Sequence, residues 1–176
     1  MVSIYVWSPC VLHGVWANPS KFRHAEPLDV PMISLLASFN ASSTSTFSID
    51  VVLDEKELRD KYIKPFRESI KNGVGSIMIS YNSWKGEKLH GHKYLINDVL
   101  KNELKFDGFV VSDWAGINEI DSDYKTSIIE SINAGIDMVM VPGSLNPDDH
   151  SYDDFIRLAV EAVQEGSISM ARITAA

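Results

Sequence analysis

The sequence predicts an α/β fold built from parallel strands and the helices that connect them. From residue 54 onward, stretches with the spacing of amphipathic helices alternate with short, nearly continuous apolar runs. Such runs are typical of strands covered on both faces, and strands separated by helices pair in parallel through right-handed crossovers. Three such strands do not close a barrel. The pattern therefore leaves two architectures open, part of a (β/α)8 barrel and an open doubly wound sheet.

The first predicted helix spans residues 54–73, with the sequence DEKELRDKYIKPFRESIKNG. Its large apolar side chains recur every four positions and form one stripe; they are Leu58, Tyr62, Phe66 and Ile70. Acidic residues come first and Lys71-Asn72-Gly73 come last, as the helix dipole and a glycine after the helix favour. Pro65 is expected to bend this helix.

Strands and helices then alternate along the chain. Apolar runs predict strands at 74–81, 108–112 and 137–141, and helical spacing predicts helices near 93–104, 123–134 and 151–165. The junction AGIDMVMVPG, residues 134–143, has the punctuation that this alternation requires. Gly135 suits the end of a helix, and Pro142-Gly143 ends the strand.

The composition excludes several classes of protein. A chain of 176 residues with 45% hydrophobic and 23% charged residues is typical of one soluble globular domain. The net charge of −8 repels phosphate backbones, so we predict no nucleic-acid partner. Cys10 is the single cysteine, which excludes an internal disulfide and a cysteine-based zinc cluster within one chain. No stretch has the length of a membrane span, so we predict no membrane partner.

Residues 1–50 differ from the rest of the chain. They hold four of the seven prolines and the polar run NASSTSTFS, residues 40–48, and they have no sustained period. Such a run cannot bury enough apolar area to offset its ordering entropy. The apolar start also lacks the basic residues of a secretory signal. We therefore predict an irregular segment at 1–50 and a folded segment at 51–176.

Residues that suit carbohydrate chemistry follow two of the predicted strands. Tyr81 ends the first strand, and Asp113 and Trp114 follow the second. The carboxyl ends of parallel strands share one edge of the sheet, where active sites gather in both candidate architectures. Apolar sugar faces stack on tryptophan, and a carboxylate can attack the anomeric carbon. The three residues therefore predict a sugar site.

Structural explanations compete with this prediction. An Asp that follows a strand is often a turn former or a helix N-cap, and Tyr81 could be a core aromatic. The HGH stretch at 90–92 offers two metal ligands, but no third ligand is evident and we predict no metal site. A phosphate- or nucleotide-binding α/β protein is a further alternative. It is disfavoured because no glycine-rich loop follows any strand.

Taken together, three stretches resemble the family-3 glycoside hydrolases, most closely their plant β-glucosidase and exo-β-glucanase branch. They are IMISYNSWKGEKLHGHKYLINDVLKNELKFDGFVVSDWAGINEI, SINAGIDMVMVP and ISMARI. The resemblance covers about residues 53–173, and the SDW motif with SYN 32 residues upstream is its most specific part. It implies that the chain is a partial (β/α)8 TIM-type barrel made of the C-terminal βα units, preceded by the irregular N-terminal segment.

The resemblance also implies roles for the predicted site. The nucleophile of the family falls on Asp113, the tryptophan that stacks on the sugar falls on Trp114, and a tyrosine beside the nucleophile falls on Tyr81. The implied activity is a retaining β-glucosidase or exo-β-glucanase that hydrolyses β-glucosides or β-glucans in cell-wall carbohydrate metabolism without a cofactor. The family's usual location is the extracellular space or apoplast. Oligomeric state is not implied.

The sequence also departs from the family pattern. The KHFxGDGGT motif, whose Lys and His grip the glucose, is not found in residues 1–50. Glu119 stands where the plant branch has an arginine on the leaving-group side, and Ala115 replaces a frequent acid. The family's acid/base Glu lies in a second domain beyond this sequence. We therefore expect this chain to be a weak enzyme, or a non-catalytic barrel fragment that at most binds carbohydrate.

Overall fold

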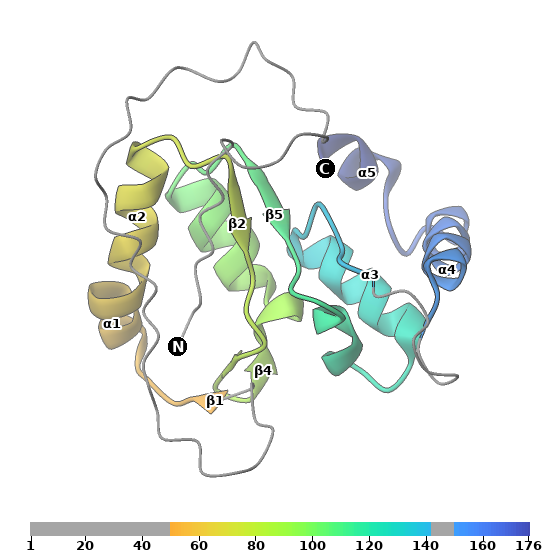
Figure 1. The fold of residues 1–176 in the computed structure, drawn as a ribbon, viewed down its shortest axis with the longest axis horizontal. Helices are drawn as coiled ribbons and strands as arrows, with labels where there is room; N and C mark the ends of the chain where they lie inside the picture. The colour runs from red at the N-terminus through yellow and green to blue at the C-terminus, as the bar shows by residue number, and fades with distance from the viewer. Residues whose placement is uncertain (1–49, 142–149) are drawn as a thin grey trace.

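The computed structural model describes residues 50–141 and 150–176. The prediction for residues 1–50 lies outside this part of the chain except for Asp50. At the centre of the described fold, β2 (Ser76–Met78) and β5 (Phe109–Val111) lie side by side and pair in parallel, with Ile77 opposite Val110 (Figure 1). The parallel pairing predicted from the alternation of strands and helices is therefore confirmed for these two strands.

The third predicted strand, 137–141, is wrong in its extent. The structure has a single parallel bridge there, between Val111 and Met138. Two residues further on, the Met140 N–H donates to the Ser112 Oγ at 2.8 Å, so a side chain takes the place of a ladder carbonyl. The backbone of this segment pairs with β5 at one bridge and then contacts the turn after β5, where the Ala115 N–H donates to the Met140 carbonyl at 3.1 Å.

The predicted first helix is present, but its centre is wider than an α-helix. A short turn α1 (Glu55–Glu57) leads into the π-helical stretch η2 (Leu58–Ile63), and α2 (Lys64–Lys71) follows with Pro65 in its first turn. Proline lacks the N–H for an ordinary helical bond and crowds the carbonyl four residues earlier, and a wider turn relieves both. The stripe packs into the core as predicted, with Leu58 and Phe66 buried.

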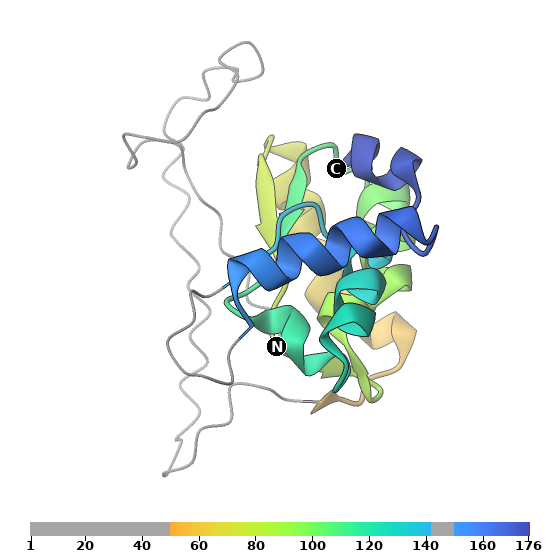
Figure 2. The same ribbon diagram turned by 90° about the vertical axis from the view of Figure 1, so that its right-hand side faces the viewer.

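The remaining helices follow the predicted positions closely. They are the π-helical η4 (Tyr94–Glu103), α3 (Tyr124–Ala134) and α4 (Tyr152–Gln164). Asp123 caps the start of α3 and Gly135, at φ 120°, ends it, as predicted for this glycine. Viewed from the side, η4 and α3 lie on the same side of β2 and β5 (Figure 2).

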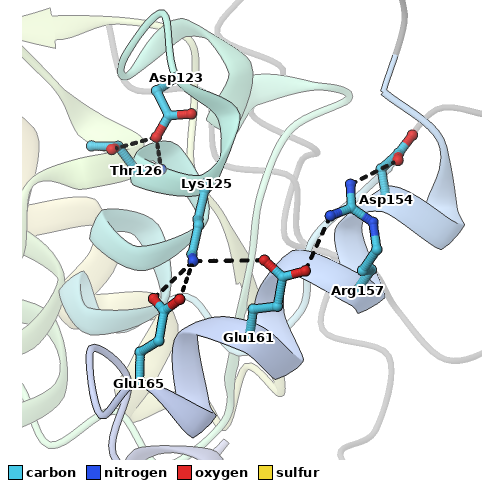
Figure 3. A network of polar contacts seen from close by, with 7 residues as sticks. All are labelled: Asp123, Lys125, Thr126, Asp154, Arg157, Glu161 and Glu165. Carbon is cyan, nitrogen blue, oxygen red and sulfur yellow. Dashed lines mark hydrogen bonds and ion pairs between the residues drawn. The ribbon is translucent and has the colours of Figure 1, made fainter.

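The end of the described chain packs against α3. Lys125 in the first turn of α3 contacts Glu165 of α4 at 2.8 Å and Glu161 at 3.6 Å (Figure 3). A last helix, α5 (Met170–Ala175), follows and was not among the predicted elements. None of the described helices is long and apolar enough to cross a membrane.

A small second sheet was also missed. It consists of β1 (Asp50–Val51), β3 (Ser83–Trp84) and β4 (Glu87–Lys88), with β1 and β3 parallel and β3 and β4 antiparallel. Lys85 at φ 53° and Gly86 at φ 84° form a two-residue hairpin turn of the type that matches strand twist. β2 ends at Met78 and this hairpin begins at Ser83, so it is the next sheet element along the chain.

The core lies between the β2–β5 pair and the helices. The central strand residues Ile77 and Val110 are completely buried, as are Ile128 of α3 and Ile168 before α5. Successive strand side chains point to opposite faces, so Ile77 and Val110, which are paired, lie on the same face of the pair. The carboxyl ends of β2 and β5 are consequently held at one edge, where the predicted site residues lie.

Candidate active site

The structure brings Tyr81, Asp113 and Trp114 together at the carboxyl ends of β2 and β5. We call these three residues the strand-exit site. The Tyr81 hydroxyl donates a hydrogen bond to the backbone carbonyl of Trp114. The two strand exits are therefore linked directly, and the acid lies next in sequence to the linked residue.

The backbone of Asp113 is held by hydrogen bonds on both sides. Its N–H donates to Nε2 of His90 at 3.0 Å. Its carbonyl accepts from the Ser112 Oγ at 2.9 Å and from the Gly116 N–H at 3.1 Å. Its carboxylate Oδ1 accepts from the Trp114 N–H at 2.8 Å. The turn after β5 thus fixes the Asp113 peptide while one carboxylate oxygen stays close to the backbone.

His90 is the buried support of this turn. The side chain lies in the short 3-10 helix η3 (Leu89–Gly91), and the residue is only 1% exposed. Its ring lies 6.0 Å from the Tyr81 ring at a tilt of 54°. Burial, with the charge of Lys88, lowers the pKa of His90 to about 4, so the imidazole is neutral near pH 7. A neutral imidazole can accept the Asp113 N–H at Nε2.

Gly116 is required by the position of this imidazole. A Cβ added at Gly116 would lie 2.3 Å from the Nε2 of His90, which is closer than real contacts allow. The preceding Ala115 adopts a left-handed conformation at φ 51°, an uncommon state for a residue with a side chain. Backbone strain of this kind clusters at functional sites. The turn is therefore specified by contacts across the fold as well as by its own residues.

The phenol of Tyr81 is a neutral donor in this site. Burial raises the pKa of Tyr81 to about 12, and the negative charges of Asp113 and Glu119 act in the same direction. Trp114, in contrast, is 54% exposed, so its indole has room for an apolar ligand face.

Glu119 is paired with a cation. It ends η5 (Gly116–Glu119), and its carboxylate contacts the Lys88 Nζ at 2.6 Å. Position 119 is where the sequence reverses the charge found in the plant branch. In the structure, the negative charge of Glu119 is paired with Lys88 of β4.

The HGH stretch serves the packing of the site. His90 binds the Asp113 amide, and His92 stacks on Trp84 at 5.4 Å between ring centroids. Both side chains are thereby engaged with protein groups, and residues 50–141 and 150–176 contain no group of three metal-ligating side chains. Two residues of this stretch, His90 and Gly91, belong to the 3-10 helix η3.

The described fold and the strand-exit site define an α/β protein with a carboxylate, an indole and a phenol at the carboxyl ends of parallel strands. The chain belongs to glycosyl hydrolase family 3: the model of that family's N-terminal domain matches residues 39–176. The matched region therefore begins within residues 1–50, the segment that the composition sets apart from the rest of the chain. Membership of the family, predicted from the SYN and SDW motifs, is confirmed; the plant branch stays a prediction.

Several curated β-glucosidases are similar in sequence. The chain is 38% identical over 120 residues to a β-glucosidase from Wickerhamomyces anomalus, a match that covers 68% of this chain and 12% of that protein. It is 37% identical over 131 residues to a β-glucosidase from Rhizobium radiobacter, covering 74% and 14%. The matched part is therefore a small fraction of each relative.

Solved structures give the same result for the fold. A mutant of the exo-1,3/1,4-β-glucanase ExoP from a Pseudoalteromonas species superposes with a TM-score of 0.65 at 40% identity. The match covers 72% of this chain and 19% of that chain. The described fold is accordingly part of an α/β fold of the TIM-barrel type. Which βα units of the barrel it contains stays a prediction.

Proposed function

We propose that this chain carries the nucleophile of a retaining β-glucosidase or exo-β-glucanase, with Asp113 as that nucleophile. The observation that carries the proposal is the place of the Asp113 carboxylate, after the carboxyl end of β5, where it accepts the backbone N–H of the exposed Trp114. Active sites of barrel enzymes gather at this end of the strands. The β-glucosidases and the exo-β-glucanase named above are similar in sequence, which supports a β-glucoside or β-glucan substrate.

The proposed reaction proceeds by two displacements. A carboxylate oxygen of Asp113 attacks C1 of the sugar and forms an ester bond, while the bond from C1 to the leaving oxygen breaks. The electron pair of that bond goes to the leaving group, which takes a proton from an acid. Water then attacks C1, a base accepts a proton from it, and the Asp113 carboxylate is released.

The other two residues bind and orient the substrate in this proposal. The exposed indole of Trp114 stacks on the apolar face of the sugar. The Tyr81 hydroxyl holds the Trp114 carbonyl. It thereby fixes the backbone between the acid and the indole, and its neutral state near pH 7 preserves that bond.

The proton donor is the part of the mechanism that the described residues supply least well. A retaining enzyme needs its two carboxyl groups about 5–5.5 Å apart. Glu119 is engaged in an ion pair with Lys88 at 2.6 Å, so its carboxylate is directed at that cation. An activated aryl leaving group departs with little protonation, so such a substrate isolates the contribution of Asp113.

The test uses dinitrophenyl 2-deoxy-2-fluoro-β-glucoside, whose glycosyl-enzyme hydrolyses slowly. We expect intact-mass analysis to find one added fluoroglucosyl group and peptide mapping to place it on Asp113. Asp113→Asn should abolish the label. Asp107→Asn, an exposed acid in the turn before β5, is the matched control and should label like the wild type. A label on another residue would overturn the assignment.

A second candidate function is carbohydrate binding without turnover, which the exposure of Trp114 favours. The two candidates differ in one result. A binding protein should change its tryptophan fluorescence with cellobiose or soluble β-glucan, lose that response in Trp114→Ala, and take no covalent label. An enzyme fragment should label Asp113 as well.

A further inference from the structure

His90 lies outside the strand-exit site but is bonded to its central residue. The Asp113 N–H donates to His90 Nε2 at 3.0 Å, across 23 positions of the chain. The imidazole is 1% exposed, so water does not compete for that bond. The space around it is closed by Gly116, where even a Cβ would lie 2.3 Å from Nε2. The ring therefore has one position, with its acceptor directed at one amide.

We propose that His90 is a positioning residue for Asp113, holding the Asp113 peptide through the Nε2 lone pair so that the carboxylate faces the substrate. The part of this inference that concerns substrate rests on the proposed function. The hydrogen bond from the Asp113 N–H to His90 does not depend on activity. An acceptor at Nε2 requires the neutral tautomer with its proton on Nδ1. Protonation of Nε2 would place two donors face to face and break the bond.

The bond matters because it limits the rotation of the peptide that carries the nucleophile. The Asp113 carbonyl is held separately, by Ser112 Oγ and by the Gly116 N–H. Without the His90 acceptor, the Asp113 N–H is left to find another partner, and the peptide plane can turn about the remaining bonds. A shift of about 1 Å in a reacting group can cost about 10²-fold in rate.

The first test is made on the wild-type chain by ¹⁵N NMR. We expect the His90 ring to be the Nδ1–H tautomer, with an unprotonated Nε2 at pH 7. A scalar coupling should connect that nitrogen to the Asp113 amide nitrogen across the N–H···N bond. A proton on Nε2, or a missing correlation between the two nitrogens, would overturn the proposal.

The second test compares two substitutions of similar size. His90→Gln keeps an acceptor near the position of Nε2, and His90→Leu removes it while still filling the space. We expect His90→Leu to slow the fluoroglucoside labelling of Asp113 by about 10–10²-fold and to shift the Asp113 amide resonance. His90→Gln should restore most of the rate. Equal rates and equal Asp113 resonances in the two folded variants would contradict the positioning role.

The matched control is His92→Leu. His92 lies two residues away and is also buried, at 5% exposure, but it stacks on Trp84 and accepts the Leu95 N–H at 3.4 Å. This substitution should lower stability without moving the Asp113 resonance or slowing the labelling. If the wild type takes no label, the proposed function fails, and the tautomer and coupling still decide the role of His90.

Discussion

Gly116 illustrates how strongly the turn after β5 depends on single atoms. Its Cα faces the His90 imidazole so closely that an added methyl would overlap Nε2 at 2.3 Å. We therefore expect Gly116→Ala to lower the free energy of unfolding by about 1–3 kcal/mol, the usual cost of overpacking. The substitution should also slow the labelling of Asp113, because the ring that supports its amide must move.

Gly75→Ala is the control for this prediction. Gly75 precedes β2, and a Cβ added there meets nothing within 4 Å. Urea unfolding of both variants gives the comparison. Similar unfolding free energies for Gly116→Ala and Gly75→Ala would show that the ring moves aside without cost, and would contradict the tight packing inferred at His90.

The sequence predicted the three residues of the strand-exit site and missed the buried groups that hold them. Tyr81, Asp113 and Trp114 were predictable because each follows an apolar run at the end where parallel strands place their chemistry. The support from His90 to the Asp113 amide joins residues 23 positions apart, and that from Ser112 to Met140 joins residues 28 apart. No local pattern encodes such bonds, since they depend on how the elements pack.

At the scale of elements, Arg172 links α5 to the core through an ion pair and two hydrogen bonds. Arg172 donates to the Asp137 carboxylate at 2.8 Å and to the carbonyls of Ile132 and Ile136, each at 2.7 Å. Its side chain is 16% exposed and that of Asp137 is 5% exposed. We expect Arg172→Met to lower the free energy of unfolding by about 3 kcal/mol, the lower end for a broken buried pair, since Lys101 still pairs with Asp137.

Arg157→Met is the matched control. Arg157 of α4 also makes two ion pairs, to Asp154 and Glu161, each at 3.2 Å, but its side chain is 57% exposed (Figure 3). Exposed pairs of this kind contribute little to stability. Denaturant unfolding should therefore separate the two variants. An equal effect of both substitutions would show that burial does not strengthen the Arg172 contacts.

The long elements were predictable and the short ones were not. The helices at α3 and α4 have caps and apolar periods within their own sequence, at Asp123 with Gly135 and at Ser151. The hairpin at 83–88 has strands of two residues each, which is too short to give a period. The predicted strand at 137–141 reduces to one bridge because its amides find other partners, such as Ser112 Oγ for Met140.

For the molecule as a whole, the sequence predicted the helix-covered face of the sheet better than the opposite face. Val110 is fully buried; on the opposite face Val111 is 6% exposed, whereas Phe109 is 46% exposed and Met138 is 52% exposed. Both faces of a parallel sheet are normally covered. The matched part of this chain corresponds to 19% of the exo-β-glucanase structure, and exposed apolar residues are consistent with a part of that size. The apolar run of a single strand does not indicate which of its two faces is left uncovered.

The pH dependence of stability is a property of the whole molecule, because the buried His90 imidazole becomes exposed to water only when the chain unfolds. The pKa of His90 is lowered to about 4 in the fold by burial and by Lys88, while an unfolded histidine keeps a pKa of about 6.5. Between these values the unfolded chain binds a proton that the folded chain does not. The contribution of His90 to the free energy of unfolding is therefore fully present above pH 6.5 and falls as the pH drops toward 4.

We expect this group alone to remove about 3 kcal/mol of stability between pH 7 and pH 4, since one pKa unit corresponds to about 1.4 kcal/mol. Urea unfolding at half-unit steps of pH measures the slope. His90→Gln keeps an acceptor for Asp113 but does not titrate, so its stability should depend less steeply on pH in this window. Part of the slope should remain, because burial also lowers the pKa of His92. Identical slopes for the wild type and His90→Gln would mean that His90 binds its proton at the same pH in the folded and the unfolded chain. The Asp113 amide would then lose its acceptor in this pH window.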